Sequence, residues 1–474
     1  MADRFCTLEW AYRVGFNSLA TPLWRVSMTK VLRRNIVRFR RYRLLKRLEY
    51  SSSEGLSIYQ GQRLRKLLEY GLATPRAEKE GGAHLFRAEG LLPAQILKTL
   101  PILQKEVVQK KLASLVSAKG RTRRSIEDRT SGSTGAPTIF IRDLACLDAE
   151  RAAAELFYRD WLGRERREPV ARIWATEADQ APTGEKVGGF FRKRISEIWL
   201  SAFNLNDADM ADFFKLWQSH EPSILIGYPE AVFECAKYLR RNRIRIPHLK
   251  GIVTAGAKLF PEMRSEVERS FMAPVLERYG SRETGLVAME CLEGRRLHVV
   301  APNVYVEILN ESGAPALPGE EGSVVVTPFY SYKMPFLRYV MGDRAKWALD
   351  QACVCGRSWP VIEEIVGRAQ DCFRLRDGGT VSGMLGYYIM RDCFDFSKIS
   401  QFQFIQESYE RVTAQIQLSM PHDEPDREFF DAIVKARDRF SQSMGPNCSI
   451  HFKFVDHIPR LSSGKHRYLM SLVD

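Results

Sequence analysis

The sequence predicts an α/β protein that has a large first domain of mixed sheets and helices and a small α+β domain at its C-terminal end. Three observations lead to this fold class. The chain has 474 residues, which exceeds the ~250–300 residues that usually share one hydrophobic core. Short apolar runs alternate with helical stretches between residues 151 and 275, and β-branched runs joined by Gly/Pro-rich turns follow from 297 to 347.

The N-terminal 120 residues are expected to be helical, because charged faces recur there with few turn signals. Eight cations crowd residues 33–47, and the apolar residues between them fit an amphipathic helix imperfectly. We expect this basic face to pack on its own domain. Contact with a membrane surface or with nucleic acid is the alternative, although nucleic acid is not an expected partner.

The middle of the chain is expected to form strand-helix units around a largely parallel sheet. Residues 224–227 and 252–254 are predicted strands, and residues 229–239 and 261–271 are predicted helices. The β-branched runs at 304–309 and 322–327 then predict an antiparallel sheet. Beyond them, alternating apolar and polar residues predict strands at 402–405 and 412–418, followed by a helix at 428–444.

Bulk composition allows several partners. Lysine and arginine number 71 against 57 acidic residues, a formal charge of +14, which favours anionic ligands such as nucleotides but suits a membrane surface equally. No apolar run approaches the ~18 residues that cross a bilayer, and no signal peptide is evident, so we expect a cytoplasmic protein. Nine cysteines in such a chain indicate thiols or metal ligands more than disulfides.

A small, hydroxyl-rich segment at residues 130–137 has the composition of a phosphate-binding loop. It reads Thr-Ser-Gly-Ser-Thr-Gly-Ala-Pro. Backbone N–H groups approach an anion closely where side chains are small, and the hydroxyls add further donors. The segment is not a Walker loop, since no Gly-Lys-Ser/Thr closes it.

Four further motifs follow in a fixed order. They are Tyr279-Gly-Ser-Arg-Glu-Thr-Gly285, Arg338-Tyr-Val-Met-Gly-Asp343, Gly367-Arg368, and Pro459-Arg-Leu-Ser-Ser-Gly-Lys465. Together with the hydroxyl-rich segment they resemble the adenylate-forming (acyl-CoA synthetase) superfamily, and residues 294–343 resemble its phenylacetate-CoA ligase branch. The resemblance covers the chain from residue 121 to the end.

The resemblance implies two domains. Residues 1–366 would form an adenylation domain, and residues 367–474 would form a small mobile lid domain that carries Lys465. In such enzymes the lid rotates after adenylation so that a second substrate reaches the adenylate. Gly378-Gly379, just past the hinge, is either part of a pantetheine tunnel or an ordinary hairpin turn.

The resemblance also assigns roles to individual residues. Lys465, Glu283 and Thr134 would be catalytic, and Glu283 would hold Mg²⁺, a hard cation that prefers carboxylate oxygen. Asp343 would accept hydrogen bonds from the ribose hydroxyls, and Arg368 would hold the ribose or the α-phosphate. The nucleotide-binding set as a whole comprises Ser131, Gly132, Ser133, Thr134, Gly135, Gly256, Ala257, Tyr279, Gly280, Ser281, Asp343 and Arg368.

A second metal site is predicted from cysteine and histidine. Cys353 and Cys355 share one turn, while Cys291 and His298 lie near the start of the preceding β segment. Four such ligands complete the tetrahedral shell of a structural zinc, and some relatives in the phenylacetate-CoA ligase branch look metal-bound here. Free buried thiols with a surface histidine are the alternative.

Four positions depart from the superfamily pattern. Arg282 stands where threonine is usual, and its guanidinium either pairs with a substrate carboxylate or faces solvent. Met341 replaces a common threonine, and Gln370 replaces the hinge aspartate, which makes the domain rotation less certain than adenylation. Thr138 replaces a lysine that many members carry.

The predicted function is ATP-dependent activation of a carboxylic acid through an acyl or aryl adenylate, followed by transfer to CoA. Transfer to an amine or to a carrier-protein thiol is the alternative, and a non-catalytic nucleotide-binding scaffold at a membrane surface is the alternative of another class. The acid itself cannot be identified, nor can the oligomeric state. Residues 190–203, 226–229 and 254–257 are expected to line its pocket, in which Tyr228, Trp199 and Phe203 are the aromatic candidates.

Overall fold

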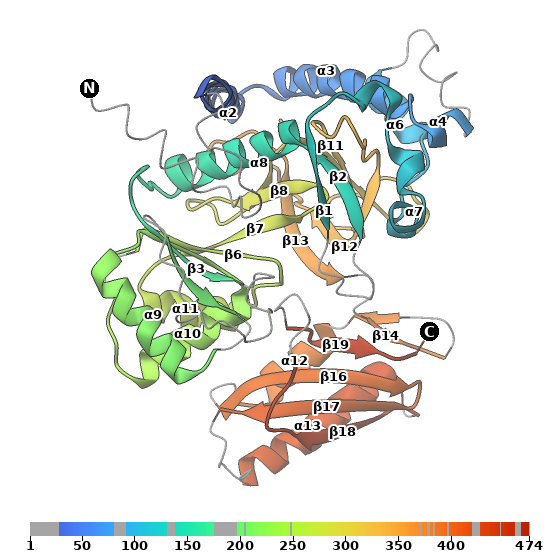
Figure 1. The fold of residues 1–474 in the computed structure, drawn as a ribbon. Helices are drawn as coiled ribbons and strands as arrows, with labels where there is room; N and C mark the ends of the chain where they lie inside the picture. The colour runs from blue at the N-terminus through green and yellow to red at the C-terminus, as the bar shows by residue number, and fades with distance from the viewer. Residues whose placement is uncertain are drawn as a thin grey trace, which may run out of the picture.

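The chain folds into a large body built on one mixed sheet and a smaller body built on a four-stranded sheet (Figure 1). The computed structural model describes residues 28–79, 92–129, 138–174, 197–202, 205–246, 249–368, 372–376, 380–382, 384–395, 398–419, 427–445, 447–459 and 466–473. Within these ranges, no helix has the length and apolar character needed to span a membrane.

The parallel half of the large sheet contains β4, β3, β5, β6 and β7, in that spatial order. These strands are β3 (Val170–Trp174), β4 (Glu197–Ser201), β5 (Ile224–Gly227), β6 (Gly251–Ala255) and β7 (Val275–Ser281). Three helices connect or cover them, namely α9 (Asp207–His220), α10 (Pro229–Arg241) and α11 (Pro261–Phe271). Every residue of β5 is buried, as expected for a strand covered on both faces. The predicted strand-helix units are therefore confirmed.

The other half of the same sheet is antiparallel. It contains β8 (Gly285–Glu290), β9 (Leu297–Val299), β10 (Val304–Leu309), β11 (Glu321–Pro328), β12 (Tyr339–Trp347) and β13 (Val361–Arg368). The direction changes between β7 and β8, where Ser281 pairs with Gly285 across a tight turn. Gly280 is required beside this turn, because a Cβ there would collide with the Gly285 carbonyl. The predicted antiparallel strands are confirmed, but they continue the parallel sheet to give 11 strands and do not form a separate one.

Helices from the first part of the chain cover this body. They are α2 (Met28–Leu48), α3 (Ser53–Gly71), α4 (Pro75–Lys79), α6 (Pro93–Thr99) and α7 (Lys105–Lys110), with short 3-10 turns at Leu112–Leu115 and Ala118–Gly120. The basic helix α2 packs along α8 (Leu144–Leu156), which continues as a π-helical turn at Phe157–Trp161. Arg34 and Arg38 both pair with Asp148 of α8, at 2.9 and 2.7 Å. This part of the basic face therefore packs on its own domain, as predicted.

A two-stranded hairpin of β1 (Ser125–Arg129) and β2 (Ile139–Asp143) lies beside the large sheet (Figure 1). Its strands pair antiparallel from Ser125 with Asp143 to Arg129 with Ile139. The predicted phosphate loop, residues 130–137, connects these strands and lies outside the described residues.

The smaller body contains β16 (Ile399–Ser408), β17 (Arg411–Leu418), β18 (Ser449–Phe454) and β19 (Leu469–Ser471), in the order β18-β17-β16-β19. Helices α12 (Met384–Cys393) and α13 (Arg427–Met444) pack against each other, and a short hairpin of β14 (Cys372–Arg374) and β15 (Thr380–Ser382) precedes them. The two predicted strands and the predicted helix are confirmed here. The predicted boundary after residue 366 falls inside β13 and stays a prediction.

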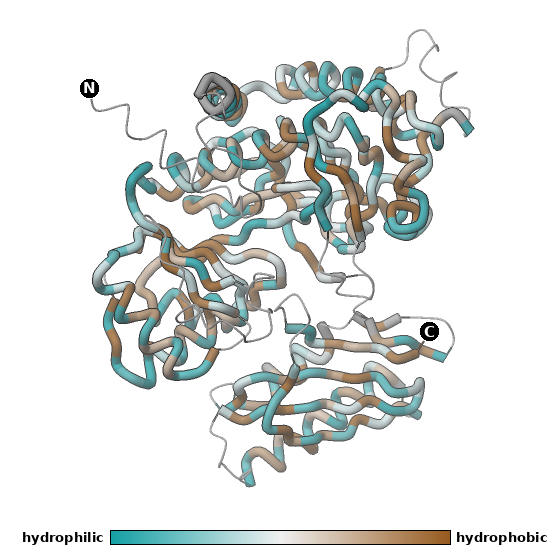
Figure 2. The backbone as a smooth tube through the Cα atoms, viewed as in Figure 1, coloured by the Kyte–Doolittle hydropathy of each residue, from teal (hydrophilic) through white to brown (hydrophobic). Residues whose placement is uncertain are grey.

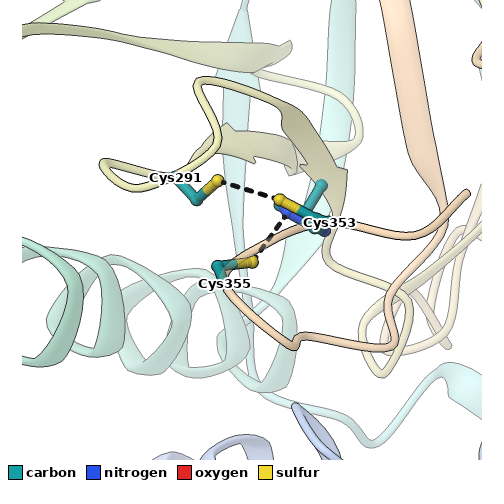
Figure 3. Close-up of side chains that lie close together, drawn as sticks. Cys291, Cys353 and Cys355 are labelled. Carbon is teal, nitrogen blue, oxygen red and sulfur yellow. Dashed lines mark hydrogen bonds between the residues drawn. The ribbon is translucent and has the colours of Figure 1, made fainter.

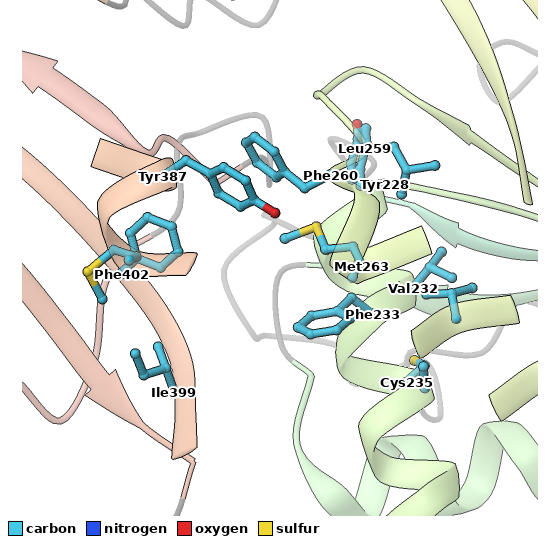
Figure 4. Packing of buried hydrophobic residues seen from close by; sticks show 14 of the residues in the cluster. Tyr228, Val232, Phe233, Cys235, Leu259, Phe260, Met263, Tyr387, Ile399 and Phe402 are labelled. Carbon is cyan, nitrogen blue, oxygen red and sulfur yellow. The ribbon is translucent and has the colours of Figure 1, made fainter. Parts of the chain in front are cut away.

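Aromatic and apolar side chains join the two bodies (Figure 4). The rings of Phe260, at the start of α11, and Tyr387, on α12, stack with their centroids 3.5 Å apart. The Lys237 ammonium donates to the Ile399 carbonyl at 3.2 Å, and the Tyr387 hydroxyl donates to Glu262. Apolar stretches lie on the inner strands, while the outer helices mix apolar and hydrophilic residues (Figure 2). The buried apolar residues of both bodies thus meet across this junction.

Candidate functional site

The turn between β7 and β8 carries Glu283, the predicted Mg²⁺ ligand. Its carboxylate is 6% exposed and accepts a hydrogen bond from the hydroxyl of Tyr339 on β12, at 3.2 Å. Burial and the Glu283 charge raise the pKa of Tyr339, so the phenol stays protonated and remains a donor. Tyr339 belongs to the motif that ends at Asp343, but no motif indicates its contact with Glu283, because the two residues lie 56 positions apart in the sequence.

The turn is closed by its own hydroxyls. The Ser281 hydroxyl accepts from the backbone N–H of Thr284 at 3.2 Å and lies 3.1 Å from the Thr284 hydroxyl. That hydroxyl in turn lies 3.4 Å from the sulfur of Met341. The methionine that departs from the superfamily pattern therefore packs against the turn, and Ser281 shapes the turn that carries Glu283.

Asp343 and Tyr279 meet beside this turn. The Tyr279 hydroxyl donates to Asp343 Oδ2 at 2.8 Å, which joins β7 to β12. The backbone of Asp343 pairs with that of Arg368 on β13, while the Arg368 side chain is outside the described residues. Gly342, just before Asp343, has a φ of 78°, a left-handed conformation that suits glycine. Asp343, the predicted ribose-binding residue, thus lies next to Tyr279 and so close to Gly280.

The carboxyl ends of the parallel strands lead to the same region. Gly256, with a φ of 89°, and Ala257 follow β6 directly, and Tyr228 follows β5. Tyr228 stacks on Trp174, at the end of β3, with ring centroids 4.1 Å apart. In open α/β sheets ligands bind at this end of the strands, next to a switch in topology. Trp174 was not among the predicted pocket residues, whereas Trp199 on β4 lies under the Arg172 guanidinium, 5.4 Å from it.

Several predicted residues fall outside the described ranges. They are Ser131, Gly132, Ser133, Thr134, Gly135, Phe203, Gln370, Gly378, Gly379 and Lys465. Their neighbours are described on both sides. Thr138 is buried and accepts from the Gln109 side-chain amide at 3.0 Å. His466 is buried, and its Nε2–H donates to the Phe402 carbonyl at 2.7 Å.

Arg282 has different partners from those expected. Its guanidinium donates to the Arg129 carbonyl at 2.9 Å and lies 3.6 Å from the Asp128 carboxylate, while its side chain is 53% exposed. Both partners belong to β1. Arg282 is thus largely exposed, as one of the two alternatives held, and it also joins the Glu283 turn to the hairpin.

Cys291, His298, Cys353 and Cys355 converge although up to 64 residues separate them. Figure 3 shows how the three cysteines approach one another. Their ligand atoms all lie within 4.8 Å of one another. Cys291 Sγ is 3.6 Å from Cys353 Sγ, and Cys355 Sγ is 3.3 Å from His298 Nε2. Ligands about 2.0–2.3 Å from a tetrahedral zinc lie about 3.5–3.8 Å apart, so these spacings fit that ion.

The histidine of this cluster is prepared as a neutral ligand. Burial lowers the pKa of His298 to about 4, so its ring is uncharged near neutral pH. His298 Nδ1 lies 3.2 Å from the Trp359 carbonyl, which can only accept. Nδ1 therefore carries the proton, and Nε2 turns its lone pair toward Cys355. A hydrogen bond of this kind commonly orients a metal-bound histidine.

The loop that bears Cys353 and Cys355 also holds the end of α2. Arg357 forms a buried ion pair with Glu49 at 2.9 Å, with side-chain exposures of 4% and 3%. Ser358 donates its N–H to the Glu49 carbonyl at 2.8 Å, and the Trp359 indole donates to the Leu48 carbonyl at 3.0 Å. No local motif indicates this anchor, because Glu49 and Arg357 lie 308 positions apart in the chain.

Comparison with known proteins relates two parts of the chain to described families. A family model described as AMP-binding enzyme matches residues 198–328, and one described as CapK C-terminal domain matches residues 382–471. Protein CapK of Staphylococcus aureus is 23% identical over 377 residues, which is 79% of this chain and 80% of that protein. A phenylacetate-coenzyme A ligase of Thermus thermophilus is 27% identical over 167 residues, 34% of this chain and 37% of the ligase.

The fold is shared with solved acyl-CoA ligases. A 2-hydroxyisobutyryl-CoA ligase in the postadenylation state, in complex with 2-HIB-AMP, superposes with a TM-score of 0.69 at 16% identity and covers 90% of this chain and 91% of its own. An anthranilate CoA ligase in complex with anthranoyl-AMP gives a TM-score of 0.51 at 14% identity, covering 72% of this chain and 65% of its own. The AMP-binding enzyme match and the fold of acyl-CoA ligases together support the adenylate-forming superfamily for this chain, which has a phenylacetate-CoA ligase among its relatives.

Proposed function

We propose that this protein uses ATP to convert a carboxylic acid into an acyl or aryl adenylate and then transfers the acyl group to CoA. One observation carries the proposal. Glu283, in the turn after β7, and Asp343, on β12, each accept a hydrogen bond from a tyrosine hydroxyl, and the bond from Tyr279 to Asp343 joins the two segments. Tyr339 thereby fixes Glu283, for which the superfamily resemblance implies a role in binding Mg²⁺. Tyr279 fixes Asp343, for which it implies a role in binding the ribose.

The first step joins two anions. A carboxylate oxygen of the acid bonds to the α-phosphorus of ATP while the bond from that phosphorus to the bridging oxygen breaks, and pyrophosphate leaves. Two unit charges ~4 Å apart repel by ~4 kcal/mol at an effective dielectric near 20, so cations must lie at the reacting oxygens. Lys465 and Arg368 are the proposed cations for the carboxylate and the α-phosphate.

The residues present also suit the metal that such a reaction uses. Glu283 offers a buried carboxylate whose orientation is fixed by Tyr339, and carboxylate oxygen is the ligand that Mg²⁺ prefers. When bound, Mg²⁺ neutralises phosphate charge. Asp343, oriented by Tyr279, would accept the ribose hydroxyls, and the backbone at Gly256 and Ala257 would border the adenine.

In the second step the CoA thiolate attacks the acyl carbon, and AMP leaves. Support comes from the ligase fold, since a 2-hydroxyisobutyryl-CoA ligase with this fold was solved in complex with 2-HIB-AMP and CoA in its thioesterification state. An amine or a carrier-protein thiol is chemically competent to take the place of CoA. The acceptor must therefore be identified by experiment.

We also propose a structural zinc at Cys291, His298, Cys353 and Cys355. Four protein ligands complete the tetrahedral shell and leave no position for substrate, which is the property of structural zinc sites. The hydrogen bond between His298 and the Trp359 carbonyl, and the spacings of the four ligand atoms, support this assignment.

The test of the adenylation proposal is acid-dependent release of pyrophosphate. ATP and Mg²⁺ are supplied with a panel of aryl, alicyclic and fatty acids, first alone, then with CoA, and then with hydroxylamine. Release that requires one class of acid, increases with CoA and disappears in Lys465→Ala while ATP still binds supports the proposal. If the rate of release does not change with CoA, but hydroxylamine traps the adenylate, the acceptor is an amine or a carrier-protein thiol. ATP binding without release for any acid favours a non-catalytic scaffold.

A further inference from the structure

Five side chains of alternating charge connect the hairpin to the Glu283 turn. In order they are Arg278, Glu150, Arg142, Asp128 and Arg282, and we call them the charge chain. The Arg278 guanidinium lies 2.9 Å from Glu150 Oε1, and the Arg142 guanidinium lies 2.6 Å from Glu150 Oε2. The Arg142 guanidinium also lies 3.3 Å from Asp128 Oδ2, and the Arg282 guanidinium lies 3.6 Å from Asp128 Oδ1.

The charge chain links four separate elements. Arg278 is on β7, Glu150 on α8, Arg142 on β2 and Asp128 on β1, while Arg282 is in the turn after β7. Arg278 and Arg282 therefore flank Tyr279, and Arg282 directly precedes Glu283. Both strands of the hairpin are thus held to the segment that carries Tyr279 and Glu283.

Burial decreases along the charge chain from its middle to its end. The Arg142 side chain is 8% exposed and both of its acidic partners are at most 23% exposed, whereas Arg282 is 53% exposed. A buried pair that loses one member is costly to the fold, but an exposed pair contributes little to stability. Arg282 can therefore be replaced without unfolding the protein, which makes it the member suited to a functional test.

Arg282 has a second contact at the place where β1 ends. Its guanidinium donates to the carbonyl of Arg129, the last residue of β1, at 2.9 Å. Residue 129 directly precedes the segment 130–137 whose composition indicates phosphate binding. One guanidinium thus holds both the carboxylate and the backbone at the end of this strand.

We propose that Arg282, as the last member of the charge chain, is a positioning residue that fixes the end of β1 relative to Glu283 and thereby sets the affinity for the ATP phosphates. The inference rests on the proposed function, because it assumes that ATP binds here. Three guanidinium groups and two carboxylates also leave one positive charge in excess, which suits a polyanionic ligand.

A direct contact between Arg282 and the acid is the competing explanation. Arg282 lies close enough to Tyr228 to act on it electrostatically, and Tyr228 is a candidate for the acid pocket. The two explanations differ in the substrate that responds. A positioning residue changes the Michaelis constant for ATP, whereas an acid contact changes that for the acid.

The experiment measures initial rates of acid-dependent pyrophosphate release by the full chain, with ATP and acid varied separately. Arg282→Thr should raise KM for ATP about tenfold, with KM for the acid and the melting temperature unchanged, because small misplacements of a binding group are costly. Arg282→Lys should recover part of the loss, since an ammonium can still pair with Asp128. Arg269→Thr is the matched control, an exposed arginine with one ion pair to Glu266 on α11, and should leave both constants unchanged.

A double-mutant cycle tests the coupling. Asp128→Asn should raise KM for ATP as well, and the double variant with Arg282→Thr should be no worse than the more severe single variant. A higher KM for the acid alone, an unchanged KM for ATP, or additive effects in the double variant would each overturn the proposal.

Failure of the proposed function gives a different result. If the wild-type protein releases no pyrophosphate with any acid, adenylation is not supported, but binding of Mg-ATP to the same variants can still be titrated by calorimetry. Weaker binding in Arg282→Thr than in Arg269→Thr supports the positioning role. Equal binding in the two variants overturns it.

Discussion

At the scale of single residues, two tyrosines orient the carboxylates of the candidate site. Tyr339 donates to Glu283 and Tyr279 donates to Asp343, at 3.2 and 2.8 Å. Each donor occupies one carboxylate oxygen and so restricts the directions in which the acid can meet a cation or a ribose. The tyrosines would then act through the carboxylates and need not touch the substrate.

Removing one of these hydroxyls should test that role. Tyr339→Phe keeps the buried ring but removes the donor to Glu283, so we expect kcat/KM for ATP in pyrophosphate release to fall by about tenfold, which corresponds to ~1.4 kcal/mol. The Mg²⁺ concentration needed for half-maximal rate should rise in parallel. Tyr305→Phe, on β10, which β11 separates from β12, is the control. An unchanged Mg²⁺ dependence in Tyr339→Phe would contradict the role.

Glu277 provides a pH-dependent prediction. The Glu277 side chain is 39% exposed, and its partial burial together with the nearby Glu290 raises its pKa to about 7, from an ordinary value of 4.5. Between pH 4.5 and about pH 7 the folded chain therefore binds more protons than the unfolded chain. The stabilisation that comes from protonated Glu277 is complete below pH 4.5 and is lost as the pH rises through about 7. Glu277→Gln should thus lose less stability than wild type between about pH 5 and pH 8, measured by urea unfolding. Equal losses in the two proteins would show that Glu277 titrates normally, and the exposed Glu54→Gln serves as control.

At the scale of elements, the cysteine and histidine cluster joins the ends of strands that are far apart in the sequence. Cys291 follows β8, His298 is in β9, and Cys353 and Cys355 lie in the loop between β12 and β13. Residues 357–359 of this loop hold the end of α2. An ion at the cluster would therefore stabilise two loops and, through one of them, an N-terminal helix.

Removal of the ion should loosen this connection. The purified protein is expected to contain one zinc per chain by mass spectrometry, and chelation or Cys353→Ser should lower the melting temperature. Trp161 and Trp359 lie beside the cluster, with Trp161 6.0 Å from His298 by ring centroids, so tryptophan fluorescence should change as well. Cys393→Ser, a partly buried thiol away from the cluster, should match the wild type. Absence of zinc with unchanged melting would contradict the assignment.

At the scale of the whole molecule, an aromatic contact holds the small body against the large one. Phe260 and Tyr387 stack at 3.5 Å, and the buried apolar residues of both bodies form one continuous cluster. In the sequence, Lys465, the proposed cation of the first step, lies between β18 and β19 of the small body. We therefore predict that the position of the small body relative to the large one decides which step is possible.

Weakening this contact should affect the two steps differently. Tyr387→Ala removes the stacked ring, so we expect a lower rate of acid-dependent pyrophosphate release, by about tenfold, while transfer of the acyl group from a supplied adenylate to CoA is preserved. Single-turnover measurements of each step make the comparison. Tyr388→Ala, a neighbouring tyrosine that is 40% exposed, is the control. Equal losses in both steps would indicate general destabilisation.

Local sequence patterns were sufficient for much of this architecture. The strand at 224–227, the helix at 229–239 and the helix at 428–444 could each be predicted from the residues of that segment alone. The joining of the parallel and antiparallel halves was not predictable, because it depends on strand pairing across the Glu283 turn. Motifs also located Glu283, Asp343, Tyr279 and Tyr339. The hydrogen bonds that pair them, the charge chain and the anchor at Glu49 arise from contacts between distant segments, which no local pattern encodes.

The anchor at Glu49 has a consequence for the order of events during synthesis. Arg357, Ser358 and Trp359 are made 308 or more residues after Glu49. At ~5–20 residues per second, roughly 15–60 s pass between the two, and for that interval α2 has no loop to hold its end. The C-terminal end of the first described helix is therefore secured late, well after Arg34 and Arg38 can pair with Asp148. A nascent chain stalled before residue 357 should leave it open to proteolysis, whereas the finished protein protects it.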